Sequence, residues 1–365
     1  MTNADARRGV RDEASLLELA RGGSERACEE LLQAYRPELH AHCYRILGSV
    51  PDAEDALQDA SLRAWRGLGD FEGRSSVRSW LYKIATNAAL DIARRRSRRE
   101  LPMSYGPPAP AGGAPGAALL ELAWVEPYPD QAFPFAPELA SPEARYEQRE
   151  SLELAFVAAL QYLSPLQRAA LILQEVLGFS NKETAELLST TVPAVQSALQ
   201  RARAAVRDRV PARSQQATLR AAGDERLRAL VQDYCDAIER ADVNAVVGML
   251  TADAAYAMPP VLTWYQGRQA IAGFLAGWGF RETWRRLPAR ASGQLAAGGY
   301  TLDARSGRWV ASALDVLTLA PDGTQIAQVT CFVTAELLAR WGYHDDRFTG
   351  AAVFPRFGLP AELPA

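Results

Sequence analysis

A stretch rich in proline and glycine, residues 101–142, does most to limit how this chain can fold. Almost half of the chain's 22 prolines lie in "LPMSYGPPAPAGGAPGAALL" and "VEPYPDQAFPFAPELASPE". Because proline lacks an amide donor and fixes φ, we expect an extended linker over residues 100–142, without a core of its own. The 365 residues are therefore divided among several domains. Four aromatic residues indicate that part of the linker docks on something: Trp124, Tyr128, Phe133 and Phe135.

Before the linker, residues 12–99 have the residue spacing of one all-α unit. Apolar residues recur at helical intervals, and Gly22-Gly23 separates the first two helices. Asp52 is the expected N-cap of the next helix. A last helix, within residues 78–99, should bury an apolar stripe and end in five arginines. The stripe is Trp80, Leu81, Ile84, Ala88 and Ile92, and the arginines are Arg94, Arg95, Arg96, Arg98 and Arg99.

After the linker, residues 143–210 predict a helix-turn-helix. Ser164 and Pro165 start one helix, and Gly178 ends it. Ser180 and Glu183 form a capping box for the next helix. A turn at residues 189–191 leads to a helix with an inward stripe of Val192, Val195, Leu199, Ala202 and Val206. Its outer face is polar and rich in arginine, as in a helix that reads the major groove. An αα-hairpin whose arginines only face solvent is the simpler alternative.

The first unit carries two surfaces of opposite charge. The loop "FEGRSSVRSW", residues 71–80, places aromatic residues beside arginines and small polar residues, which suits capture of an unpaired base. The arginine cluster that follows offers a surface for phosphates. By contrast, the helix that starts near Asp52 is acidic, and DNA would repel it. Two partners are therefore expected, DNA on one face and a protein on the other.

Two segments together resemble a known family. They are "DAEDALQDASLRAWRGLGDFEGRSSVRSWLYKIATNAALDIARRR" and "LSPLQRAALILQEVLGFSNKETAELLSTTVPAVQSALQRARAAV". In this order and spacing they resemble regions 2 and 4 of bacterial sigma-70 family sigma factors of the extracytoplasmic-function (ECF) type. The resemblance covers residues ~12 to 210. It implies region 2 over residues 12–99, region 4 over residues 143–210, and two partners, promoter DNA and core RNA polymerase.

The resemblance also implies roles for individual residues. The β′ clamp helices of polymerase would contact Asp52, Glu54, Asp55, Leu57, Gln58 and Asp59. The −10 element would be read and melted by Arg74, Ser75, Ser76, Arg78, Lys83, Asn87, Arg94, Arg95 and Arg96. The −35 element would be read by Thr191, Gln196, Ser197, Gln200, Arg201, Arg203 and Arg207, with the β flap as a further polymerase contact of the factor.

From residue 224 the pattern changes to α+β. The order helix, helix, strand, helix and then strands over residues 224–345 resembles the SnoaL-like branch of the NTF2-like fold, a curved sheet around an open cavity. Asp315 is a lone acid in a strand and the one candidate for a catalytic base. The cavity would be lined by Tyr256, Met258, Trp264, Trp278 and Asp315. Residues 346–365 form a tail rich in proline and phenylalanine.

Composition excludes few further functions. The net charge of −3 argues neither for nor against binding to nucleic acid. Four widely spaced cysteines are typical of a cytoplasmic protein whose thiols are reduced. His40, His42 and Cys43 do not share one helix face, so neither a metal nor another cofactor is expected. The polar N-terminus and the short apolar runs predict a cytoplasmic protein that does not contact a membrane.

The function that follows is a sigma factor, not an enzyme, whose C-terminal domain regulates it. An anti-sigma factor and a small-molecule ligand of that domain are candidate further partners. Two alternatives stay open. One is a helix-turn-helix regulator with a ligand-sensing NTF2-like domain, which would not need the acidic helix. The other is an NTF2-like enzyme with a DNA-binding appendage, which lacks a second acid or histidine at a defined spacing.

Overall fold

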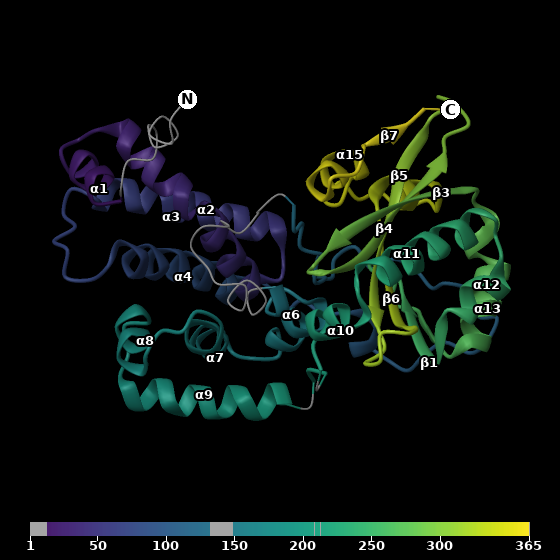
Figure 1. The fold of residues 1–365 in the computed structure, drawn as a ribbon, viewed down its shortest axis with the longest axis horizontal. Helices are drawn as coiled ribbons and strands as arrows, with labels where there is room; N and C mark the ends of the chain where they lie inside the picture. Colours follow the sequence, from purple (N-terminus) through teal and green to yellow (C-terminus); the bar gives the residue numbers. More distant parts are fainter. Residues whose placement is uncertain (1–12, 132–148, 208, 212, 365) are drawn as a thin grey trace. The chain divides into compact units, whose positions relative to one another are not determined.

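The computed structural model describes residues 13–131, 149–207, 209–211 and 213–364 (Figure 1). They form two compact units. The first comprises the residues up to Leu47, then Pro51–Arg96 and Leu163–Arg203. The second comprises Gly48–Val50, Ser97–Tyr162 and the residues from Ala204 onward. Among the helices of the described ranges, none combines the length and apolar character needed to cross a bilayer.

The first unit is built from helices. They are α1 (Glu13–Arg21), α2 (Glu25–Leu47), α3 (Val50–Gly67), α4 (Val77–Arg95), α7 (Pro165–Leu171), the π-helical turn η3 (Ile172–Val176), α8 (Asn181–Leu187) and α9 (Val192–Arg207). The expected breaks occur at glycines with positive φ, Gly23 at 89° and Gly178 at 74°. A side chain at such angles is strained, so these positions suit glycine.

The start of α3 corrects the sequence prediction. The helix begins at Val50, so Asp52 lies in the first turn and is not the N-cap. Pro51 is compatible with this earlier start, because the first turn of a helix does not use the amide donor that proline lacks.

The buried face of α4 is also wider than the predicted stripe. Leu81 and Ala88 are buried as expected, whereas Trp80, Ile84 and Ile92 are only half-buried. Tyr82, Thr86 and other residues outside the predicted stripe are buried instead. The reason is that α4 packs against α2 and also against α7 and α8, so two of its sides are covered.

The second unit contains a mixed sheet in the order β2-β1-β6-β5-β4-β3, with β7 paired to β5. Only the β1–β6 pair is parallel among the strands of the described chain. The strands are β1 (Leu250–Ala257), β2 (Trp264–Gln266), β3 (Trp284–Ala291), β4 (Gln294–Leu302), β5 (Trp309–Leu319), β6 (Ile326–Val333) and β7 (Glu362–Leu363). β3 and β4 form a hairpin. Ser292 (φ 54°) and Gly293 (φ 67°) form its tight turn.

Helices cover this sheet. In Figure 1, α11, α12 and α13 lie together beside the strands; α11 packs on β3 and β4, and α13 packs on β1 and β2. The helices of the unit are η2 (Pro102–Ser104), α6 (Leu154–Leu160), α10 (Gln215–Ala222), α11 (Asp224–Glu239), α12 (Val243–Gly248), α13 (Arg268–Gly277), η4 (Gly279–Arg281), α14 (Ala335–Arg340), α15 (Gly350–Val353) and η5 (Phe354–Phe357). The expected α+β architecture is confirmed.

The described part of the linker lies on this α+β domain. Trp124 and Tyr128 are buried, and the Tyr128 amide donates to Ser292 Oγ at 2.9 Å. Ala118 forms a bridge with Val261. The expected docking of the linker aromatics is thus seen at Tyr128, whereas Trp124 contacts Tyr105 and Leu119 of the linker itself. Phe133 and Phe135 lie outside the described residues. The tail also docks on the sheet, because β7 pairs with Trp309 and Val310 of β5.

Candidate functional site

The acidic surface of α3 is narrower than the sequence predicts. Asp55 and Gln58 are exposed, and Glu54 and Asp59 are half-buried on the same outer side. Asp59 pairs with Arg63, one turn further along. The other two predicted contact residues point inward: Leu57 is 2% exposed and Asp52 is 5% exposed. Asp52 also forms an ion pair with Arg96, at 3.4 Å between Oδ1 and Nη2.

The loop before α4 presents small polar side chains. Ser76 is the N-cap of α4, since its Oγ accepts from the Ser79 amide at 3.1 Å. Ser75 is exposed, and exposed Arg74 pairs with Glu72 at 2.9 Å. The loop therefore keeps an exposed rim of polar and charged groups.

Further along α4, the predicted DNA-contacting residues are accessible to different degrees. Lys83 is exposed and Asn87 is half-buried. Arg94, Arg95 and Arg96 are all exposed, and Arg94 reaches back to Asp91 at 3.1 Å.

Arg78, a predicted −10 contact, also makes contacts within the first unit. Its guanidinium lies 3.4 Å from Glu38 and over two aromatic rings, Tyr82 at 4.8 Å and Phe179 at 5.3 Å. Phe179, from the turn before α8, also packs edge-to-face on Tyr82 with 5.6 Å between ring centroids. Arg78 therefore contacts Glu38, Tyr82 and Phe179 while its side chain stays 37% exposed.

The helix-turn-helix forms as predicted. Both halves of the Ser180–Glu183 capping box are present, and Ser189 has a positive φ of 50° in the tight turn. Thr191 Oγ1 accepts from the Ala194 amide at the start of α9. Val195, Leu199, Ala202 and Val206 are buried, and Val192 is half-buried. The outer side of α9 carries half-buried Ser197 and exposed Gln196, Gln200, Arg201, Arg203 and Arg207.

Charged groups on α9 are partly engaged within the protein. Arg201 donates to Ser197 Oγ at 2.7 Å. Arg203 forms an ion pair with Glu175 of the π-helical turn η3. Both pairs lie at the surface, where such contacts stabilise little and can exchange for phosphate contacts.

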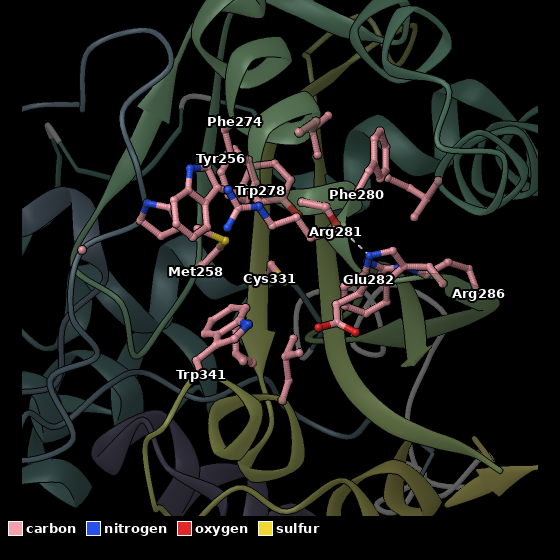
Figure 2. A pocket seen from close by; sticks show the side chains of 18 of the residues that line it. Tyr256, Met258, Phe274, Trp278, Phe280, Arg281, Glu282, Arg286, Cys331 and Trp341 are labelled. Atoms are coloured by element: carbon pink, nitrogen blue, oxygen red, sulfur yellow. Dashed lines mark hydrogen bonds between the residues drawn. The ribbon is translucent and has the colours of Figure 1, made fainter. Parts of the chain in front are cut away.

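The C-terminal domain contains a pocket of about 340 Å³. Figure 2 shows Tyr256, Phe274, Trp278, Phe280 and Trp341 around it, with Cys331 between them. Tyr256, Met258 and Trp278 therefore line a cavity as predicted. Trp264 and Asp315 are not among the residues that line this pocket.

Asp315 is instead fully buried behind the pocket wall. Its Oδ2 accepts from Arg286 Nη1 at 2.8 Å and from the Tyr234 hydroxyl at 2.8 Å. Burial and the nearby Asp315 carboxylate raise the pKa of the Cys331 thiol well above its usual value. The prediction that Asp315 faces the cavity is wrong because Arg286, from β3 on the far side of β4, covers it.

Sequence reasoning missed Arg286, which lines the pocket and has a side chain only 3% exposed. Its space is provided by Gly299, where a Cβ atom would lie 2.7 Å from the guanidinium carbon. The adjacent glycines Gly298 and Gly299 in a strand were the available signal, since glycine in a strand often marks a close approach.

Comparisons with known proteins agree with the sequence resemblance. The sigma-70 region 2 family matches residues 31–99, and the sigma-70 region 4 family matches residues 153–206. The ECF RNA polymerase sigma factor SigG of Mycobacterium tuberculosis is 38% identical over 344 residues, which cover 91% of this chain and 83% of SigG. SigM of the same organism is 32% identical over 54% of this chain and 84% of SigM.

The fold also agrees with a solved structure. The crystal structure of the Mycobacterium tuberculosis ECF sigma factor SigJ covers 84% of this chain and 96% of SigJ, with a TM-score of 0.53 and 22% identity. A match of that length includes the two sigma domains and extends into the C-terminal domain. Because a 38% identical sigma factor also aligns with nearly the whole chain, the stand-alone helix-turn-helix regulator is no longer a competing explanation. The chain belongs to the ECF sigma factors of the sigma-70 family, which bind core RNA polymerase and direct it to promoter DNA.

Proposed function

We propose that three surfaces divide the work of this sigma factor. The outer side of α3 binds the β′ clamp helices, the loop before α4 and the exposed side of α4 take the −10 element, and α9 reads the −35 element. The corresponding division of the chain is region 2 over residues 12–99, a linker over 100–142, region 4 over 143–210, a SnoaL-like domain over 224–345 and a tail over 346–365.

The proposed polymerase contact consists of Glu54, Asp55, Gln58 and Asp59. These four share the outer side of α3, whereas Asp52 and Leu57 pack inward and support the helix. An acidic patch attracts a basic partner surface and repels DNA, so it orients region 2 on polymerase.

The proposed −10 contact relies on exposed polar groups around the start of α4. Ser75 and Arg74 on the loop, with Lys83 and Asn87 on the helix, provide hydrogen bonds and positive charge. Extruding a base costs a few kcal/mol, which contacts of this kind offset. The arginines at the end of α4 add phosphate contacts.

The proposed −35 contact places the start of α9 in the major groove. Gln196, Ser197, Gln200 and Arg201 would contact base edges, and Arg203 and Arg207 would contact phosphates; their accessibility on the outer side of α9 supports this.

Promoter binding requires the first unit to open. Elements about 25 base pairs apart are separated by roughly 85 Å of B-form DNA at 3.4 Å per base pair. The packing of α4 against α7 and α8 keeps the region 2 and region 4 helices in one compact unit. The compact unit is therefore the resting form, and it releases Arg78 from Phe179 when it opens on polymerase.

The C-terminal domain acts as a regulator and not as a catalyst. Its one candidate base, Asp315, is sealed by Arg286 and Tyr234 and does not line the pocket. The Cys331 thiol in the pocket is held in its neutral form, because burial and Asp315 raise its pKa. Neither group is available as a base or a nucleophile.

The observation that carries the proposal is that an exposed acidic side of α3 and an exposed arginine-rich side of α9 occur in one ECF sigma chain. The test is promoter-specific transcription in vitro at increasing concentrations of core polymerase, which measures how tightly the sigma factor binds polymerase. Asp55→Arg should weaken polymerase binding at least tenfold. Asp70→Arg, the same charge change just after α3, should change it less than twofold. Equal effects of the two substitutions would contradict the assignment of the α3 surface.

A further inference from the structure

We infer that the pocket of the C-terminal domain binds a neutral, largely aromatic small molecule with one hydrogen-bond acceptor, and that the linker between regions 2 and 4 senses it. The inference rests on the proposed regulatory role of this domain.

The walls of the pocket favour flat apolar rings. Seven aromatic side chains surround it: Tyr256, Phe274, Trp278, Phe280, Trp284, Trp341 and Tyr343. Its volume of about 340 Å³ lies in the range of sites that enclose a drug-sized molecule. Trp278 is 38% exposed and Arg281 stacks on its ring at 3.7 Å, so this pair stands where the pocket meets solvent.

The polar end of the pocket is Arg286. Its Nε atom is buried and has no hydrogen-bond partner within the described part of the chain. An unpaired buried donor is costly, and a ligand acceptor placed beside it removes that cost. We place the carbonyl oxygen of the ligand beside this guanidinium, because Arg286 lines the pocket and its side chain is almost fully buried.

The charges around the pocket favour a neutral ligand over an anion. Two of the charged lining groups are already paired: Arg286 with the buried Asp315, and Glu282 with Arg340. The third, Arg281, stacks on Trp278 where the pocket meets solvent. Asp315 already neutralises Arg286 at 2.8 Å. A ligand carboxylate would therefore stand near a second buried carboxylate, which a low-dielectric site disfavours.

The linker forms part of the pocket wall. Pro115 and Gly116 both line it. The Gly116 amide donates to Thr263 Oγ1 at 2.7 Å, and a Cβ atom on Gly116 would stand 2.7 Å from that oxygen. Nearby, the Tyr265 hydroxyl donates to the Gly113 carbonyl at 2.9 Å, and Leu119 donates to Pro260 O at 3.0 Å.

A molecule in the pocket consequently contacts both the sheet and the linker. It binds more tightly when the linker is docked, because Pro115 and Gly116 then complete the wall. By linkage, the ligand must stabilise the docked linker by the same factor. A docked linker leaves less chain free between regions 2 and 4, so the bound ligand should lower initiation.

The first experiment uses prodan, a neutral naphthalene ketone whose fluorescence reports its surroundings, with the full-length protein. Prodan should bind one site per chain with blue-shifted emission. The parent dimethylaminonaphthalene without the ketone, and the matching naphthoate anion, should each bind at least tenfold more weakly. Equal binding of the anion or of the parent compound would overturn the proposed chemistry of the ligand.

Variants locate the site. Trp278→Ala should weaken prodan binding at least fivefold, while Leu302→Ala, an exposed apolar residue of the same domain outside the pocket, should not. Because Arg286→Met alone would leave Asp315 buried without its partner, the double variant Arg286→Met with Asp315→Leu is the informative one. It should stay folded and lose the preference for prodan over the parent compound. A preference that survives in this variant would contradict the role of Arg286.

Hydrogen exchange and transcription test the coupling. Prodan should slow amide exchange of residues 113–119 in the wild type but not in the Trp278→Ala variant. It should lower run-off transcription from the holoenzyme at least threefold. Transcription without prodan tests the sigma function separately, so an inactive holoenzyme refutes the proposed function alone. An active holoenzyme that binds prodan with unchanged or increased transcription refutes the coupling alone.

Discussion

Truncating Phe179 should shift the first unit toward its open form. The ring makes two contacts with α4, an edge-to-face pair with Tyr82 and a cation–π contact with Arg78 at 5.3 Å. Each contact contributes about 1 kcal/mol. Phe179→Ala should therefore weaken closure by about 2 kcal/mol, which raises the ratio of open to closed protein roughly thirtyfold.

Energy transfer between dyes on the two regions measures this ratio. Ser75→Cys and Gln200→Cys place exposed thiols on region 2 and region 4. All four native cysteines are buried, so labelling is selective for the new positions. Phe179→Leu, which keeps apolar volume but loses both ring contacts, should give an intermediate ratio.

A matched control decides whether the Phe179 ring holds the first unit closed. Leu166→Ala, at an exposed position of α7, is the control for general effects on region 4. If Phe179→Ala leaves the ratio within twofold of the Leu166→Ala control, while circular dichroism shows intact helices, then the aromatic contacts do not hold the unit closed.

Three further predictions concern pH, salt and packing. Burial raises the pKa of Glu153 to about 7 from 4.5, so the folded protein binds an extra proton between these pH values and loses stability as pH rises. Glu153→Gln should remove up to about 3 kcal/mol of this loss, measured by urea unfolding at pH 5 and 8; an unchanged pH dependence would argue against it. Arg207→Ala should reduce the salt slope of −35 DNA binding by about 1 in fluorescence anisotropy, and an equal slope would mean that Arg207 does not contact phosphate. Gly299→Ala should displace Arg286 and destabilise the protein by about 2 kcal/mol in thermal unfolding, whereas Gly277→Ala, with open space around its Cβ position, should have little effect.

Local signals in the sequence predicted local structure well. The Ser180–Glu183 capping box and the Gly178 stop depend on residues only a few positions apart, and both occur. The start of α3 was misplaced because Asp52 and Pro51 each fit a helix start, and the pattern alone does not rank them.

Long-range contacts account for the errors at the candidate sites. The sequence of α4 does not show that Phe179 covers Arg78, because that contact depends on how region 4 packs on region 2. Similarly, alternation along β5 placed Asp315 toward a cavity, but a residue of β3 fills the space in front of it. The pocket residues found from the sequence lie in β1 (Tyr256), directly after it (Met258) and at the end of α13 (Trp278), so their positions follow from local structure.

The docking of the linker has a consequence for protein synthesis. Asp130 near the linker's end accepts from the Gly293 amide at 2.9 Å, yet Gly293 is translated 163 residues later (293 − 130). At 5–20 residues per second, this corresponds to a delay of roughly 8–30 s. The region 2 and region 4 helices, which end at Arg207, are complete before the hairpin that receives the linker exists. The proposed regulation by the C-terminal domain therefore begins only after the proposed polymerase-binding and DNA-binding regions of the same chain are complete.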